Sequence, residues 1–273
     1  MFSSICKLST TISSRYILVE TLSRRMSQKH SRMEDYFKDK RFVVTGASAG
    51  MGKVIAERLI DLNSYVFAIG RDPENLPPES SKVKHVVLDV SDWNLAYKLT
   101  SEIGPVHGLV NNAGVAHIEP FLELSKDGWE DTINVNARGM IRISQAVVKN
   151  MIDAGIKGSI VNVSSTISER VVPDHVSYCA SKGAVNQITR TMAIEFGPKG
   201  IRTNNVCPTV VLTKMGMKAW SDPAKSKPIM DRIPLGRFAM PDDIADATIF
   251  LLSDYAKMVN GLNLYVDGGF MSG

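Results

Sequence analysis

Three residues in the second half of the chain combine side chains that could transfer a proton. Tyr178 and Lys182 lie four residues apart, and Ser165 precedes Tyr178 by thirteen residues. Positions i and i+4 of a helix share a face, so the phenol and the ammonium would lie side by side. A nearby ammonium stabilises phenolate and is therefore expected to lower the pKa of Tyr178 from about 10 toward useful proton transfer. The spacing alone is weak evidence, because Tyr36 and Lys40 repeat it, and we interpret that pair as surface without function.

A glycine-rich turn near residue 46 could bind the dinucleotide that would accompany the proton-transfer residues. Gly46, Gly50 and Gly52 follow an apolar run and open a stretch of helical periodicity, which predicts a strand–turn–helix unit. Glycine lets phosphate approach the main chain, and a helix N-terminus offers free N–H groups to a pyrophosphate. The spacing G-x-x-x-G-x-G differs from the common G-x-G-x-x-G, so the flanking strand and helix carry the argument. Together the two motifs predict hydride transfer with a dinucleotide, coupled to proton transfer.

Short apolar runs alternate with amphipathic helical stretches from residue 40 onward. The helical stretches cover 50–63, 126–153 and 178–196, and another begins near residue 241. The expected strands cover 42–44, 65–69, 85–88, 109–110, 159–163, 202–206 and 262–266. This alternation predicts an α/β single-domain Rossmann fold, a doubly wound seven-stranded parallel sheet with helices on both faces.

Length and charge narrow the class of protein. The 273 residues are 44% hydrophobic and 22% charged, which is ordinary for a globular domain over 33–273. Residues 1–32 hold six of the 32 basic residues but one of the 28 acidic ones, so the remaining body is close to neutral. A nucleic-acid partner is therefore not expected, because it needs a basic face. No apolar run approaches the roughly 20 residues of a membrane span.

Residues 1–32 differ in composition from the body. They are rich in Ser and Thr, contain Arg, and are nearly free of acid, which is typical of a mitochondrial transit segment. The alternative is a disordered extension, with translation starting at Met26 or Met33. The expected location is intracellular and soluble, cytoplasmic in the second case and the mitochondrial matrix in the first.

Cysteine and histidine usage indicates neither a disulfide framework nor a metal site. Cys6, Cys179 and Cys207 form no C-x-x-C pattern, which fits a reduced compartment. The histidines are scattered without H-E-x-x-H, so we expect no metal; they are His30, His85, His107, His117 and His175.

The end of the second expected strand indicates the cofactor. A ribose 2′-hydroxyl calls for an acid there, whereas a 2′-phosphate calls for a cation. The sequence places Gly70 and then Arg71 at this point, and Arg can grip a phosphate through two parallel bonds. NADP(H) is therefore expected, although Asp72 could pair with Arg71 or face water. The adenine is assigned to Asp89 and Val90.

Further cofactor contacts are expected along the strand ends. The turn contributes Gly46, Ser48, Gly50, Met51 and Gly52, and the fourth strand ends in Asn112, Ala113 and Gly114, beside the ligand crevice of such sheets.

A proline-rich segment, about 208–240, breaks the β–α rhythm. It carries Pro208, Pro223, Pro228 and Pro234, and also Met215, Met217, Trp220 and Ile229, which are too apolar for a linker. Long loops inside a compact domain are usually functional, so we expect a lid over a small-molecule pocket, with a subunit contact as the alternative.

At this point the chain resembles the short-chain dehydrogenase/reductase family over roughly 38–273. The matching segments are 45–52, 111–114, 134–136, 164–165, the pair Tyr178 and Lys182, and 266–269. The resemblance implies that Tyr178 is the general acid–base and that Lys182 orients the nicotinamide ribose and tunes Tyr178. It also implies that Ser165 polarises the carbonyl and that Asn136 holds a water for proton relay.

Three more segments, 207–211, 220–223 and 233–238, resemble a subgroup that reduces L-xylulose to xylitol, and α-dicarbonyls such as diacetyl, with NADPH as homotetramers. That resemblance adds Pro208, Val211 and Thr213 to the cofactor contacts. It also assigns His175 and Trp220 to the substrate pocket with Ser165 and Tyr178; a loop histidine and a packing tryptophan are the alternatives.

Departures from this subgroup bear on substrate choice. Thr166 and Ile167 stand where Gln and Cys are expected, and Met51 replaces the usual Ile. The loss of one hydrogen-bond donor can change discrimination by about 1–3 kcal/mol. Other substrates of the same family, such as steroids or acyl thioesters, therefore stay open. A protein that keeps the fold for binding only is disfavoured by the intact set of four catalytic residue types.

Overall fold

The structure is a computed structural model that describes residues 33–273, so the expected extension 1–32 lies outside the described residues. The side chains of residues 215, 218, 219 and 225 are also not described. Contacts divide the chain into Met1–Tyr36 and Phe37–Gly273. The first described element is the short helix α2 (Met33–Phe37). The second unit holds the whole sheet and all the described candidate site residues.

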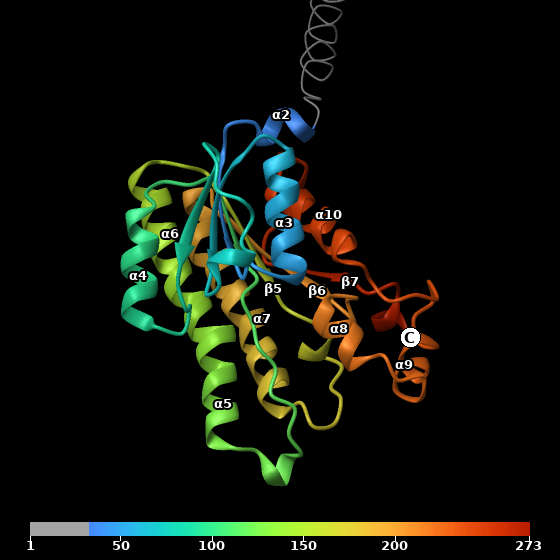
Figure 1. Cartoon of the computed structure of the whole chain (residues 1–273). Coiled ribbons are helices and arrows are strands. Elements are labelled where there is room, and N and C mark those ends of the chain that lie inside the picture. Colours follow the sequence, from blue (N-terminus) through green and yellow to red (C-terminus); the bar gives the residue numbers. More distant parts are fainter. Residues whose placement is uncertain (1–32) are drawn as a thin grey trace, which may run out of the picture. The chain divides into compact units, whose positions relative to one another are not determined.

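Seven parallel strands form one sheet in the order β3-β2-β1-β4-β5-β6-β7 (Figure 1). The strands are β1 (Arg41–Thr45), β2 (Tyr65–Gly70), β3 (Val83–Val87), β4 (Gly108–Asn111), β5 (Ser159–Val163), β6 (Arg202–Pro208) and β7 (Asn263–Val266). Val43 of β1 pairs with Phe67 on one side and Leu109 on the other, so the strand order reverses between β1 and β4. The doubly wound seven-stranded sheet expected from the sequence is confirmed. Ligands bind such sheets at this reversal, outside the carboxyl ends of the strands.

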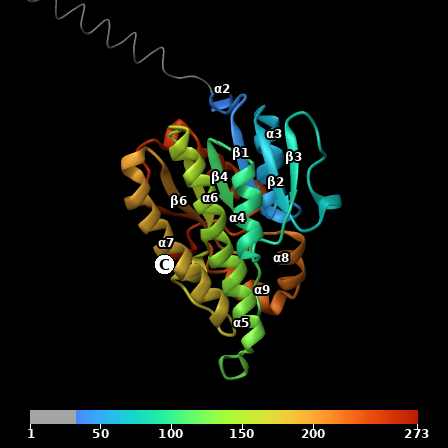
Figure 2. The same ribbon diagram turned by 90° about the vertical axis from the view of Figure 1, so that its left-hand side faces the viewer.

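Helices cover both faces of the sheet. On one face α3 (Gly50–Asp61) packs against α10 (Pro241–Leu252). On the other, α4 (Trp93–Glu102) packs against α6 (Met140–Asp153), and α7 (Val176–Phe196) packs on β6; Figure 2 looks onto this layer.

The stretch 126–153, expected as one helix, has three parts. They are α5 (Lys126–Ile133), a π-helical segment (Asn134–Gly139) and α6. Helix α4 was not expected from the sequence. The short 3₁₀ helices are Pro73–Asn75, Phe121–Glu123, Thr166–Ser168, Gly197–Lys199, Asp254–Ala256 and Phe270–Ser272.

The segment 208–240 contains two helices that its prolines concealed. Helix α8 (Lys214–Ala219) begins after Thr213, whose side chain accepts from the N–H of Gly216. Helix α9 (Pro223–Met230) starts with a proline, which is tolerated in the first turn because that N–H needs no partner. Figure 1 shows both helices near the C-terminal end of the chain. The segment is therefore folded, with Trp220, Ile229, Phe238 and Phe270 packed in one apolar cluster.

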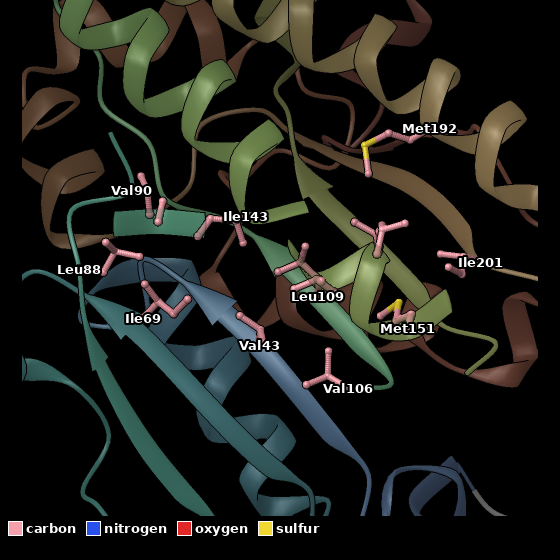
Figure 3. Packing of buried hydrophobic residues seen from close by; sticks show 14 of the residues in the cluster. Val43, Ile69, Leu88, Val90, Val106, Leu109, Ile143, Met151, Met192 and Ile201 are labelled. Carbon is pink, nitrogen blue, oxygen red and sulfur yellow. The ribbon is translucent and has the colours of Figure 1, made fainter. Parts of the chain in front are cut away.

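Apolar side chains from the central strands and helices meet in one core (Figure 3). Val43, Leu109 and Ile160 come from three neighbouring strands, and Ile143 from α6, and all four are fully buried. Protein interiors pack as densely as organic crystals, so this hydrophobic core holds the strand ends in place. The residues that follow the carboxyl ends of these strands are therefore attached to a packed core.

Gly52 shows how closely the turn and the sheet are packed. A Cβ on Gly52 would collide with the carbonyl of Gly46 and the side-chain amide of Asn112. Gly183, within α7, has nothing within 4 Å of an added Cβ.

We therefore expect opposite effects from two glycine substitutions. Gly52→Ala should lower the free energy of unfolding by about 1–3 kcal/mol, because backbone atoms must move. Gly183→Ala should raise it by about 0.5–1 kcal/mol, because alanine loses less chain entropy in a helix. Denaturant unfolding of both variants measures this, and equal effects would contradict the packing role of Gly52.

Candidate active site

A cavity of about 1130 Å³ opens at the carboxyl ends of the strands. Its wall contains the residues that follow β1, β2, β4, β5 and β6, as the strand order requires. Most of the expected site residues line it: Gly46, Ser48, Gly50, Met51, Arg71, Asp89, Val90, Asn112, Ala113, Gly114, Ser165, His175, Tyr178, Lys182, Pro208, Val211, Thr213 and Trp220. Gly52 and Asn136 are not part of the wall and support it from behind.

The glycine turn is held against the end of β4. Gly46 and Gly50 have φ angles of +66° and +55°, which favour glycine. The Thr45 hydroxyl accepts from the N–H groups of Asn112 and Ala113, both at 3.0 Å. Ala49, which precedes α3, provides no side-chain cap, so the first N–H groups of the helix face the cavity without one. This turn has the features of an anion-binding helix N-terminus.

Arg71 and Asp89 meet at the end of β2 and β3. The Arg71 Nη1 lies 3.5 Å from the Asp89 carboxylate. Partial burial raises the pKa of Asp89, but hydrogen bonds from Ser91 and the charge of Arg71 outweigh it, so the net pKa is lowered. Asp72, considered above as the partner of Arg71, instead caps the next turn and accepts from the N–H of Glu74 and the side chain of Asn75. The partner of Arg71 thus comes from the segment that follows the neighbouring strand β3.

Ser165, Tyr178 and Lys182 come together on one wall. Ser165 follows β5, and its hydroxyl donates to the Pro208 carbonyl at 3.4 Å. The same hydroxyl lies near enough to Tyr178 to act on the pKa of that phenol. Tyr178 and Lys182 lie one turn apart on α7, and the Lys182 Nζ lies 5.5 Å from the centre of the Tyr178 ring. The same Nζ donates to the Val163 carbonyl at 2.7 Å, and Lys182 is only 4% exposed.

The expected lowering of the Tyr178 pKa is wrong for this state. Burial raises the pKa of Tyr178 to about 12, and the hydrogen bond with Ser165 acts in the opposite direction. Burial also lowers the pKa of Lys182 to about 8. The physical reason is that the ammonium lies over the ring and binds the Val163 carbonyl, while desolvation disfavours both charged forms.

Asn136 lies behind the wall, in the π-helical segment. Its Oδ1 accepts from the Val115 N–H at 2.8 Å, and its Nδ2 donates to the Val115 carbonyl and the Ser181 hydroxyl, both at 2.9 Å. The side chain is therefore engaged in tying the loop after β4 to α7. Both N–H groups of the side chain are used in this way, whereas Oδ1 accepts one bond and keeps a second acceptor position.

His175 and Trp220 both line the cavity. The Nδ1 of His175 lies 2.6 Å from the Pro173 carbonyl, which can only accept, so Nδ1 carries the proton. The Nε2 of a neutral His175 is then an acceptor. Trp220 packs on Phe238 with ring centres 6.2 Å apart, so it serves in the apolar cluster as well as in the wall.

Two residues, one in the cavity wall and one behind it, were not expected from the sequence. Arg170 lines the cavity and donates to the Gly273 carbonyl at 2.7 Å, while its guanidinium stacks 4.8 Å from the Phe270 ring. Asn186 lies one turn beyond Lys182 and is 4% exposed. The i+4 spacing from Lys182 was a signal for Asn186, whereas Arg170 had none.

Two findings concern other kinds of site. Among residues 33–273, no group of three or more His, Cys, Asp or Glu side chains could hold a metal ion. Over the same range, none of the helices combines the length and apolarity needed to cross a membrane.

Comparison with known proteins agrees with this geometry. The profile of the family described as enoyl-(acyl carrier protein) reductase matches residues 46–271. The chain belongs to the short-chain dehydrogenase/reductase family and is an oxidoreductase with a nicotinamide cofactor.

Among its relatives, the L-xylulose reductase of Mus musculus is 45% identical over 85% of this chain and 97% of the relative. Carbonyl reductase [NADPH] 2 of Sus scrofa is 38% identical over 88% of this chain and 100% of the relative. A gluconate 5-dehydrogenase from Burkholderia cenocepacia, solved with NADP and tartrate, superposes with a TM-score of 0.83 at 30% identity, covering 89% of this chain and 100% of that one.

The burial of Lys182 predicts a pH-dependent cost in stability. Its pKa is about 8 in the folded chain against an ordinary 10.5. The unfolded chain holds this proton more tightly, so the cost is fully present below pH 8 and vanishes as the pH rises to 10.5.

Lys182→Met keeps the chain length and removes the charge, so it should stabilise the ligand-free protein at pH 7 by about 1–3 kcal/mol. The gain should shrink between pH 8 and 10. Denaturant unfolding at several pH values measures it, with the exposed Lys126→Met as control. A gain that does not change with pH would contradict the charge-burial account.

Proposed function

We propose that this protein is an NADPH-dependent carbonyl reductase that reduces L-xylulose to xylitol and α-dicarbonyls such as diacetyl. The supporting observation is the cluster of Ser165, Tyr178 and Lys182 in the wall of the cavity that also contains the glycine turn. Relatives named L-xylulose reductase, and the D-erythrulose reductase of Gallus gallus at 43% identity, support a short ketose as substrate.

The residues present fit a phosphorylated dinucleotide. The uncapped start of α3 suits the pyrophosphate, and Arg71 at the end of β2 suits a 2′-phosphate. When bound, the nicotinamide supplies the hydride to the carbonyl carbon. Asp89, Val90 and Asn112–Gly114 line the same cavity, and we assign them to the adenosine and nicotinamide ribose sides.

Tyr178 is the proposed acid in the direction of reduction. A pKa of about 12 keeps its phenol protonated at neutral pH, and an alkoxide is a much stronger base. The Tyr178 hydroxyl gives its proton to the substrate oxygen, while the Ser165 hydroxyl donates a hydrogen bond to that oxygen. The Lys182 ammonium, close to the ring, stabilises the phenolate that forms. Asn136 fixes the position of α7 relative to the loop after β4, through its bonds to Val115 and Ser181.

The outer half of the cavity is proposed to select the substrate. The acceptor Nε2 of His175 suits a substrate hydroxyl, and Trp220 gives an apolar wall. Thr166 and Ile167 line the same region. They bear on the alternative, another carbonyl or alcohol of this family, which the family description and the gluconate 5-dehydrogenase relative both represent. Steady-state kinetics discriminates between the proposed substrates and this alternative. The substrates to compare are L-xylulose, diacetyl, gluconate and an acyl thioester, each with NAD(H) and with NADP(H).

Three further features are part of the proposal. The segment 208–240 is the proposed substrate lid, since its Trp220, Val211 and Thr213 all line the cavity. A homotetramer and the role of residues 1–32 in targeting rest on resemblance and composition alone. Light scattering tests the first of these, and N-terminal sequencing of the endogenous protein tests the second.

Tyr178→Phe should reduce the rate of carbonyl reduction by about 10²- to 10⁴-fold, because the acid is removed. Binding of NADPH, measured by fluorescence titration, should change little. Tyr36→Phe removes a hydroxyl from the second Tyr-x-x-x-Lys sequence and should leave the rate unchanged. Wild-type turnover by Tyr178→Phe would disprove the assignment.

Arg71→Ser should weaken binding of 2′,5′-ADP by about 10- to 100-fold, because a charge-assisted contact is lost. Binding of 5′-AMP, which lacks the 2′-phosphate, should stay within twofold. Calorimetric titration of both ligands measures the difference. An equal loss for both ligands, or a wild-type preference for NADH, would contradict the proposed cofactor choice.

A further inference from the structure

Asn186 extends the catalytic face of α7 by one turn. Tyr178, Lys182 and Asn186 occupy positions i, i+4 and i+8, so they lie along one side of the helix. Asn186 is buried, with 4% of its surface exposed, and it does not line the cavity. A buried amide costs free energy unless its hydrogen bonds are made, so its partners show what it holds.

All the partners of Asn186 lie on the strand side of the helix. Its Oδ1 accepts from the Ser164 hydroxyl at 2.7 Å and from the Asn205 Nδ2 at 3.1 Å. Its Nδ2 donates to the Ser168 hydroxyl oxygen at 2.8 Å. The side chain therefore joins α7 to the end of β5, to β6 and to the short helix Thr166–Ser168.

The amide also sets the direction of the next hydrogen bond. Since Nδ2 can only donate, the Ser168 hydroxyl must accept from it and is left to donate its own proton. That proton goes to the carbonyl of Ser165, at 2.7 Å. The chain Asn186 to Ser168 to Ser165 thus ends on the main chain of the proposed carbonyl-polarising residue.

This chain continues a row of buried polar side chains that crosses the sheet. Asn111 of β4 donates to Asn162 at 2.8 Å, and Asn162 donates to Thr189 at 2.8 Å. Thr189 then donates to Asn205 at 2.7 Å, and Asn205 donates to Asn186. Along this row each side chain donates to the next one toward Asn186, and the Asn186 Oδ1 receives the last of these bonds, so the orientation of its amide is determined by its neighbours.

We propose that Asn186 is a positioning residue that holds the Ser165 main chain, through Ser168, at the right place relative to Tyr178 and Lys182. This inference rests on the proposed reductase activity. The hydroxyl of Ser165 caps the turn that Ser168 closes, accepting from the Ile167 N–H at 3.2 Å. The Ser165 carbonyl also accepts from the main-chain N–H of Ser168 at 3.2 Å. Loss of the bond from the Ser168 hydroxyl therefore loosens the turn that aims the Ser165 hydroxyl without opening it, and leaves the glycine turn unchanged.

Two variants interrupt the chain at different points. Ser168→Ala removes one hydroxyl and leaves the other bonds of Asn186 in place. Asn186→Leu has similar volume but removes the whole junction. Both should lower kcat for diacetyl by about 10- to 100-fold, as expected for a small misplacement of a reacting group. The affinity for NADPH should stay within twofold, and kcat should fall more than KM changes.

A double-mutant cycle shows whether Asn186 acts through Ser168. The variant carrying both substitutions should have the same kcat as Asn186→Leu. The reason is that Asn186→Leu already removes the hydrogen bond through which Ser168 would be held. Asn150→Leu is the matched control, since Asn150 donates to the Ser101 carbonyl from α6, away from the cavity. Amide hydrogen exchange at residues 165–170 should be faster in both variants than in the wild type and the control.

Several outcomes would overturn the inference. These are unchanged kcat in Ser168→Ala, additive effects in the cycle, or a parallel loss of NADPH affinity, which would indicate general damage. If the wild type does not reduce diacetyl or L-xylulose, the proposed function has failed, and the exchange data still decide the positioning role. If Asn186→Leu does not fold, Ser168→Ala carries the test by itself.

Discussion

A buried ammonium governs the architecture around this site. Lys182 lies almost completely inside the molecule, where a charge is stable only with strong partners, and its Nζ is held by the carbonyl at the end of β5. This contact ties α7 to the sheet at the point where Ser165 leaves it. Burial lowers the pKa of this lysine and raises that of Tyr178. At neutral pH both groups are therefore held in their protonated forms in the ligand-free chain, and burial makes the phenol a weaker acid than an exposed tyrosine.

Several polar side chains are buried in the interior around Lys182. Ser164, Asn186 and Asn205 lie beside it with almost no exposed surface, in a part of a parallel sheet that is usually apolar. Each of these three groups has a hydrogen-bond partner, which restrains its side chain. A rigid polar interior next to a reacting group is what precise positioning requires. The stability given up by burying polar groups is consistent with a catalytic role.

Sequence patterns predicted the sheet well because each strand is a local apolar run. All seven strands were located, with differences of one or two residues at their ends. Helix α4 was missed, and so were α8 and α9, which lie in the segment expected as a loop; α9 has Pro223 in its first turn and Pro228 inside the helix. The direction of the Tyr178 pKa shift was wrong, because charge proximity can be inferred from i,i+4 spacing whereas the extent of burial cannot.

The sequence by itself determined the family, the order of the elements and the residue types in the cavity wall, because these depend on local spacing and short motifs. Tertiary structure decided which groups face one another. It paired Arg71 with Asp89, which follows the neighbouring strand β3, rather than with Asp72. It also placed the Asn186 side chain against Ser168 and Asn205. Such pairs are set by strand register and helix packing, which bring together residues far apart in the chain.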